Sequence, residues 1–243
     1  MEEANYIFNY LPVRFKDTNE QEYIKYLWET YESNYDNGKY QFAFMAYHML
    51  FMSSVYFNIW QVKSVKEDDF NKIKLGFNEG LGNATNPFGF SAENERKVFD
   101  LLKYICASHT DVKSLIGNYK RLVDERNDIA HASGTIPFKT DTYLHKRVTD
   151  ILRYSDEIQS FTKSIIQECF ENFLKESQDQ DTRQYYDASE QINEVLIHQH
   201  YLSQKDIEFC IEYDITKLSG ESNYNEIERL HEVLKNEYEI NNE

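Results

Sequence analysis

The chain has 243 residues, of which 41% are hydrophobic, so it is long enough to bury a sizeable core. Its formal net charge of −16 argues against a protein that coats nucleic acid non-specifically, because neutralising phosphates requires clustered Lys and Arg. Only 8 Gly and 3 Pro interrupt the sequence, which is too few for a turn-rich β architecture, and an all-α fold is therefore predicted.

The N-terminal region is expected to be an irregular arm followed by a helix. The first eighteen residues mix aromatic and charged side chains around Pro12. A helix is predicted from Asn19, a candidate N-cap that acidic residues follow in the first turn. Tyr23 and Leu27 lie at helical spacing on its apolar face, and residues 36–38, Asp-Asn-Gly, end it. No positively charged region precedes an apolar one, so we expect no secretory signal.

Residues 40–62 contain no charged side chain and are flanked by Lys39 and Lys63, so a membrane span has to be weighed against a core helix. Polar residues, His48 among them, are spread through the segment, and its aromatic residues fill the middle instead of the two ends. We therefore expect no membrane span but a central helix that is buried on most sides, part of which could face a second subunit.

Two shorter helices and a connection are expected next. Residues 67–69, Glu-Asp-Asp, begin a short helix, and the interval between Gly80 and Gly89 is rich in glycine and turn-forming residues. This interval is interpreted as a plain connection between helices, with a mobile lid as the alternative. Ser91 and Asn94 are expected to start the helix that follows.

Residues 109–111, His-Thr-Asp, are expected to break the helix that Ser91 and Asn94 start, and Thr110 or Asp111 can cap a long helix that follows. Its apolar residues recur every three or four positions from residue 112 to residue 130, and it is expected to stop at Ser133 and Gly134, with Pro137 preventing its resumption. It ends in the segment Arg-Asn-Asp-Ile-Ala-His, residues 126–131. Arg126 and His131 stand about 140° apart around the helix axis, which a long Arg side chain can span near a frayed end. The negative end of the helix dipole favours a protonated His131, which could therefore titrate near neutral pH as a general acid or base. On spacing alone, the alternative to a functional site stays open, namely that Arg126 and Asp128 are solvated helix charges and that His131 caps the C-terminus of the helix.

A second long helix is predicted from about residue 140 to residue 176. Residues 101–153 hold nine Lys or Arg against six Asp or Glu, a local charge of +3, so the Arg/His segment lies in the least acidic part of the chain. The basic side chains considered for phosphate binding in this part are Lys120, Arg121, Arg147 and Arg153. Their alternative role is a solvated helix face.

The C-terminal part is expected to be an acidic helical extension, because residues 168–243 hold six Lys or Arg against nineteen Asp or Glu, a local charge of −13. We place the boundary between a helical domain, residues 1–176, and this extension, residues 177–243. Its predicted helices cover residues 185–200, 205–218 with Ser203 as N-cap, and 224–238.

No metal or other cofactor is expected. The sequence contains three widely separated cysteines, Cys106, Cys169 and Cys210. Their odd number and spacing predict reduced, buried thiols in a cytoplasmic protein. The C-terminal part also contains His198, His200 and His231. Because no Cys or carboxylate stands at a zinc-like spacing from them, they are interpreted as interface histidines.

The order of helices and the segment 126–131 together resemble the HEPN family, small all-α domains of prokaryotic RNases, toxins and defence systems. Its motif is an Arg, four to six residues and a His, commonly with a polar residue directly after the Arg. Arg126, Asn127 and His131 match this motif, and the resemblance extends in helix order over roughly residues 20–176. It implies an antiparallel helical bundle and a homodimer that places two copies of the motif in one cleft.

The resemblance implies metal-independent cleavage of RNA. His131 would act as general acid or base on the ribose 2′-hydroxyl or the leaving oxygen, and Arg126 would stabilise charge on the phosphate. Asn127 would orient the phosphate or one of these side chains. Attack by the 2′-hydroxyl predicts RNA and not DNA as the substrate.

The resemblance thus implies a toxin or antiphage ribonuclease, with an antitoxin or a regulatory protein as its partner. Some toxin members carry a modified Tyr two residues after the His, whereas this chain has Ser133, so that form of control is not supported. The acidic extension could mask the basic face, hold a partner or maintain solubility. The alternative function is a non-catalytic helical dimer that binds proteins as a scaffold.

Overall fold

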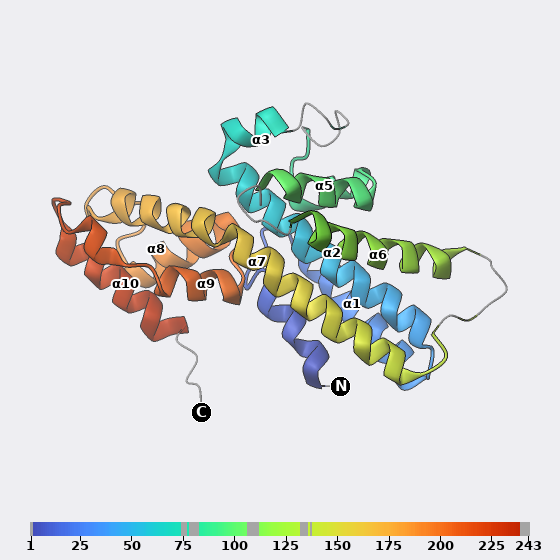
Figure 1. The fold of residues 1–243 in the computed structure, drawn as a ribbon. Helices are drawn as coiled ribbons and strands as arrows, with labels where there is room; N and C mark the ends of the chain where they lie inside the picture. The colour runs from blue at the N-terminus through green and yellow to red at the C-terminus, as the bar shows by residue number, and fades with distance from the viewer. Residues whose placement is uncertain are drawn as a thin grey trace.

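The computed structural model describes residues 2–73, 77, 83–105, 112–131, 136 and 138–238, the side chains of residues 69, 73, 104 and 105 excepted. Within these residues the chain forms helices and no β-strand, so the all-α class is confirmed (Figure 1). Several sequence-based expectations lie outside the described residues, namely those for Gly80, Gly82, Cys106, residues 109–111, Ser133, Gly134 and Pro137.

The expectation of an irregular N-terminal arm is wrong. Residues Glu2–Tyr10 form a 3-10 helix, η1, whose Ala4 and Ile7 are buried. The Tyr47 hydroxyl donates a hydrogen bond of 3.0 Å to the carbonyl oxygen of Ala4, and η1 packs on α7 and α9. The apolar spacing of Ala4 and Ile7 gives η1 a face to bury, which explains why this segment is ordered as a helix.

Helix α1 spans Thr18–Asp36, and its N-cap is Asp17 instead of the expected Asn19. Asp17 has extended backbone angles, and its carboxylate accepts the backbone N–H of Asn19 at 2.8 Å. An ionised cap is favoured here because its negative charge also meets the positive end of the helix dipole.

Helix α2, Tyr40–Val65, is the central helix of the molecule and packs against α1, α7, α6 and η3. It is long and apolar enough to cross a membrane, yet 83% of its most apolar stretch is buried inside the protein. The expectation of a core helix is therefore confirmed. Its polar side chains find partners within the core, as Asn58 does in Gln159 at 3.1 Å.

Between α2 and α7 lie α3 (Glu67–Ile73), η3 (Pro87–Ala92), α5 (Glu95–Ile105) and α6 (Val112–Ala130). The expected plain connection up to Gly89 ends in the 3-10 helix η3, which also contains Ser91. Asn94 begins α5 as expected, because its side-chain oxygen accepts the backbone N–H of Arg96 at 2.9 Å.

Helix α7, Asp141–Ser177, runs through both halves of the molecule and nearly matches the expected range (Figure 1). Its N-terminal part, as far as Ile158, belongs to a first hydrophobic cluster with η1, α1, α2, α5 and α6. From Ile166 onward it belongs to a second cluster with the C-terminal helices. The end of α7 coincides with the expected boundary at residues 176 and 177, but α7 itself supplies apolar side chains to both clusters.

The C-terminal helices differ in part from expectation. The helix expected over residues 185–200 is a continuous helical run over residues 188–200, which is α-helical in α8 (Ala188–Gln191) and π-helical in η4 (Ile192–His198). The helix expected over residues 205–218 is interrupted and forms α9 (Gln204–Ile211) and the 3-10 helix η5 (Ile215–Leu218). Helix α10 (Tyr224–Tyr238) has the expected bounds. Ser203 caps α9 in a capping box with Asp206, as predicted for the cap.

A buried polar network joins the second cluster to the first. Asp206 is fully buried and accepts hydrogen bonds from Gln61 of α2 at 2.8 Å and from Gln159 of α7. Burial raises the pKa of Asp206, and these hydrogen bonds oppose the rise. The C-terminal part is therefore packed onto the first cluster through specific polar contacts.

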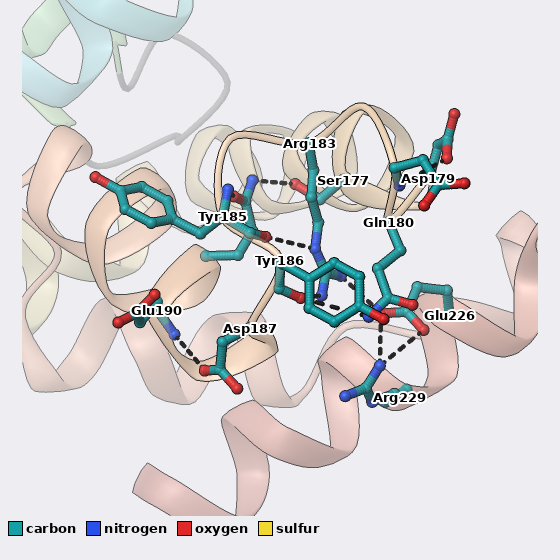
Figure 2. Close-up of polar contacts among 12 residues, drawn as sticks. Ser177, Asp179, Gln180, Arg183, Tyr185, Tyr186, Asp187, Glu190, Glu226 and Arg229 are labelled. Carbon is teal, nitrogen blue, oxygen red and sulfur yellow. Dashed lines mark hydrogen bonds and ion pairs between the residues drawn. The ribbon is translucent and has the colours of Figure 1, made fainter.

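A buried arginine holds the connection between α7 and α8 in place (Figure 2). The side chain of Arg183 is 0% exposed and forms an ion pair of 2.6 Å with Glu226 of α10. Its Nε donates to the carbonyl oxygen of Tyr185 at 2.7 Å, and its Nη2 donates to that of Tyr186. Because the guanidinium is paired and hydrogen-bonded, its burial is compensated.

Candidate functional site

The three residues of the expected catalytic motif lie at the C-terminal end of α6. Arg126 and Asn127 belong to the helix, and His131 follows its last residue. The backbone N–H of His131 donates to the carbonyl oxygen of Asn127 at 3.0 Å, which extends the helical hydrogen bonding by one residue. The His131 side chain is exposed and makes no hydrogen bond to any described residue. Its ring is therefore not used as a cap within the described structure.

Arg126 is instead tied to a network of three helices. Its Nη2 lies 2.5 Å from Oε1 of Glu95, the first residue of α5, and its side chain is 27% exposed. The other oxygen of Glu95, Oε2, lies 3.0 Å from Nε2 of His48, which is fully buried on α2. Glu95 thus bridges two basic side chains whose positions are 78 residues apart in the chain.

The charge state of Glu95 follows from this arrangement. Burial alone would raise its pKa, but the hydrogen bonds and charges of His48 and Arg126 outweigh burial and lower it to about 2. Glu95 is therefore ionised at neutral pH and can only accept, so Nε2 of His48 carries the donated hydrogen. Arg126 consequently has a carboxylate partner in this conformation, and a phosphate would have to compete with Glu95 for it.

Three of the four other basic residues considered for phosphate binding are paired with carboxylates. Lys120 lies 2.7 Å from Asp100, and Arg153 lies 2.8 Å from Glu157. Arg147 contacts two carboxylates, Glu125 at 2.5 Å and Asp150 at 2.8 Å. Arg121 is exposed and forms no ion pair with any described residue. Among these four, Arg121 is the side chain most available to an incoming anion.

A cavity of about 470 Å³ opens beside Glu95, between α1, α2 and η3. Its wall is partly aromatic, with Tyr23 of α1, Tyr56 of α2 and Phe88 of η3. Glu20 of α1 also lines it. Glu95 therefore belongs both to the cavity wall and to the network that holds Arg126.

Sequence reasoning missed Glu95 and His48 as parts of this site. A usable signal was present for His48, since a histidine within 23 uncharged residues must find a polar partner if the helix is buried. The partner could not be named, because many carboxylates of the chain were equally eligible. Glu95 looked like an ordinary acidic residue in the first turn of a helix.

The cysteines and histidines of the C-terminal part have structural contacts. Cys169 and Cys210 are free and buried, and burial raises the pKa of Cys169 to about 12. His231 contacts the carbonyl oxygen of Ile211 at 3.0 Å, and burial lowers the pKa of His200 to about 4, with a contribution from Lys16. Among the described residues, no group of three or more His, Cys, Asp or Glu is arranged to hold a metal ion.

Comparisons with known proteins leave the site to be interpreted from its own geometry. No protein-family model matches the chain, and neither a curated protein nor a solved structure gives a match.

Proposed function

We propose that this protein is a metal-independent endoribonuclease of the HEPN type that acts as a dimer, as a toxin or antiphage effector under the control of a partner protein. The observation that carries the proposal is the end of α6, where the His131 side chain is exposed and makes no hydrogen bond to any described residue, five positions after Arg126. A ring free of structural contacts, at the same helix end as a cation, is available for acid–base work on a phosphodiester.

The proposed chemistry uses the ribose itself as nucleophile. His131 takes the proton of the 2′-hydroxyl or gives one to the leaving 5′-oxygen, while the 2′-oxygen attacks phosphorus and the bond to the 5′-oxygen breaks. The products are a 2′,3′-cyclic phosphate and a 5′-hydroxyl. Arg126 stabilises negative charge on the non-bridging oxygens, and Asn127 orients the phosphate or a neighbouring side chain. The second copy of the chain supplies the second motif of the cleft.

Glu95 and His48 add a positioning step to this scheme. Glu95 holds the Arg126 guanidinium at 2.5 Å, and the buried His48 holds Glu95. An RNA phosphate would share Arg126 with Glu95 or replace it. The pair therefore keeps Arg126 in a defined orientation before substrate arrives, at the cost of lowering the positive charge that the substrate meets.

The experiment that tests the proposal incubates purified wild-type, Arg126→Ala and His131→Ala proteins with labelled tRNA and total RNA in excess EDTA. Product ends are then analysed. Lys113→Ala is the matched control, because Lys113 is exposed near the opposite end of α6 and its replacement also removes one positive charge. Wild type and control should cleave, leaving a 2′,3′-cyclic phosphate, while His131→Ala should be slower by about 10²–10⁴-fold.

Two results would reject the assignment. Equal cleavage by wild type and both motif variants would mean that the site lies elsewhere or that a contaminant cuts. Sedimentation as a monomer at micromolar concentration would remove the composite cleft.

A protein-binding scaffold is the second candidate function. The observation that favours it is the pairing of Arg126, Arg147 and Arg153 with carboxylates, which lowers the positive charge that these three side chains offer to RNA. In that case all four proteins would be inert toward RNA even when the wild type is a dimer, and a pull-down from the native host would recover the same partner with wild type and with His131→Ala.

A further inference from the structure

The cavity between α1, α2 and η3 has the size and the aromatic wall of a site for a planar ligand. Its volume of about 470 Å³ falls within the usual range for ligand pockets. The Phe88 ring of η3 is in edge-on contact with Tyr23 of α1 and with Tyr56 of α2, at 5.3 and 6.5 Å between ring centroids. Met49 and Met52 of α2 add flexible apolar side chains. A flat, partly apolar ring would therefore pack well in this cavity.

Two phenol hydroxyls and one amide in this wall are available to a ligand. The hydroxyls of Tyr23 and Tyr56 make no hydrogen bond to any described residue, and neither oxygen is sealed from solvent. Tyr56 is only 6% exposed and lines the cavity, so the solvent that its hydroxyl meets is that of the cavity. Asn86 uses its side-chain oxygen to accept the backbone N–H of Gly89 at 3.0 Å, while its amide N–H groups bind no described residue. These groups can donate and accept hydrogen bonds at the polar edge of a ring.

The charges around the cavity favour a neutral ligand. Asp17, Glu20 and Glu95 line it, and no Lys or Arg does so within the described part of the chain, so a phosphate inside would meet negative charge without a cation. The carboxyl groups are also engaged by the protein. Asp17 accepts the backbone N–H of Asn19 at 2.8 Å, Glu20 accepts the Tyr201 hydroxyl at 3.1 Å, and Glu95 is held in the network described above. Neither an anion nor a cation therefore finds a ready partner inside.

The cavity lies next to the proposed catalytic residues. Glu95 lines it and pairs with Arg126 at 2.5 Å. The charges of Glu95 and Arg126 both act on the Tyr56 hydroxyl, because Glu95 adds to the rise of its pKa that burial causes and Arg126 opposes it. The hydroxyl is therefore protonated at neutral pH. A ring in the cavity and a phosphate at Arg126 are close enough to belong to one strand.

We propose that this cavity binds one nucleobase of the RNA strand, adjacent to the phosphate at Arg126, with the base packed on Tyr23 and Phe88 and its polar edge hydrogen-bonded to Tyr56. The inference rests on the proposed ribonuclease function and names a residue, Tyr56, that contacts its substrate. Stacking on aromatic side chains is a common way for proteins to hold the bases of single-stranded RNA. The phosphates stay outside the acidic cavity, at the end of α6.

Nuclear magnetic resonance of the full chain labelled at the methionine methyl groups tests whether the cavity takes a base. The probes are adenosine, guanosine, cytidine and uridine, with ribose as the control probe. At least one nucleoside should shift the signals of Met49 and Met52 saturably, while Met45, which does not line the cavity, stays unchanged. Ribose should shift none of them.

Tyr56→Phe should weaken nucleoside binding about threefold to tenfold, because it removes one hydrogen bond and keeps the ring. Tyr26→Phe is the matched control, because Tyr26 is 64% exposed on α1, does not line the cavity and loses the same hydroxyl. It should bind like wild type. Equal affinity of the two variants, or the absence of saturable shifts with all four nucleosides, would overturn the inference.

A short 2′-O-methyl RNA, which lacks the attacking hydroxyl, separates a base of a strand from a free nucleoside. It should bind about tenfold more tightly than the nucleoside, and Arg126→Ala should remove this gain, because the phosphate next to the base then has no guanidinium. A strand that binds no better than the nucleoside would overturn the inference in favour of a free nucleoside ligand. These measurements need no cleavage, so failure to cut RNA would count against the proposed function and failure to bind would count against the base site.

Discussion

Glu95 shows how a single side chain can connect the interior of this protein to its candidate site. It reaches the buried His48 with one oxygen and the half-buried Arg126 with the other. If Arg126 serves RNA cleavage, then Glu95 is its positioning residue. The strength of the Arg126–Glu95 ion pair then sets how readily a phosphate can replace Glu95 as the partner of Arg126. The contacts of Glu95 also contribute to folding stability, because His48 and Arg126 together lower the pKa of Glu95 to about 2.

Replacing Glu95 by Gln should therefore destabilise the protein in a pH-dependent way. A carboxylate whose folded pKa is depressed stabilises the fold above its unfolded pKa, and this contribution is lost as pH falls through the folded value. With an ordinary value near 4.5 and a folded value of about 2, the contribution is on the order of 3 kcal/mol at neutral pH.

Urea unfolding of wild type and Glu95→Gln at pH 7, 5 and 3 measures this contribution of Glu95 to the free energy of unfolding. The difference in unfolding free energy should be nearly constant between pH 7 and pH 5 and clearly smaller at pH 3. The exposed replacement Glu22→Gln serves as control and should stay close to wild type at each pH. A difference that is the same at all three pH values would show that the loss arises from packing instead of charge.

At the scale of elements, the 3-10 helix η3 is held very close to the segment that precedes it. A Cβ placed on Gly89 would lie 2.8 Å from the Cβ of Ala84, closer than real Cβ contacts come, and 3.0 Å from its Cα, tighter than most such contacts. Glycine is required here by proximity, because only its missing side chain lets η3 approach Ala84. Phe88 and Ser91 of η3 line the cavity, so this contact also shapes it.

Gly89→Ala should lower the free energy of unfolding by about 1–3 kcal/mol, because the clash involves backbone that cannot move aside easily. Gly117→Ala is the matched comparison, since Gly117 lies within α6 and an added Cβ meets nothing within 4 Å. Alanine is the better helix former there and should stabilise by up to about 1 kcal/mol. Thermal unfolding of both variants provides the test, and changes of the same sign would contradict the geometry.

At the scale of the whole molecule, two hydrophobic clusters share one helix. α7 supplies Ile158 to the first cluster and Ile166 to the second, and Asp206 is hydrogen-bonded to Gln61 and Gln159 across the junction. Separating the clusters would expose apolar residues of α7 and leave a buried carboxylate without donors. We therefore expect the two clusters to unfold together.

Leu230→Ala offers a way to observe this coupling. Leu230 is fully buried in the second cluster, and its truncation should cost about 2–5 kcal/mol. Both tryptophans, Trp28 and Trp60, belong to the first cluster, so their fluorescence reports its unfolding alone. In Leu230→Ala the fluorescence transition should move to lower urea together with the far-ultraviolet dichroism.

Glu228→Ala is the control for this experiment, because Glu228 is exposed on the same helix and its truncation should change stability by less than about 0.5 kcal/mol. A fluorescence transition that stays in place while the dichroism becomes biphasic would mean that the clusters unfold independently.

Local sequence patterns were enough to predict the helical class and the positions of the long helices. The bounds of α10 agree with expectation, and those of α2 and α7 nearly do. These features are local, because apolar spacing and the scarcity of glycine and proline act within a few turns of chain. Ser203 could be recognised as a cap for the same reason. The segment from Arg126 to His131 was likewise visible as a pattern of residue types.

Which partners these residues meet depends on the tertiary structure. It pairs Arg126 with Glu95 and Glu95 with His48. It also turns the N-terminal arm into η1, which buries Ala4 and Ile7, and it gives the middle of the helix expected over residues 185–200 a π-helical geometry. Pairing and burial depend on which faces of distant helices come together, and that information is not carried by spacing within any one of them.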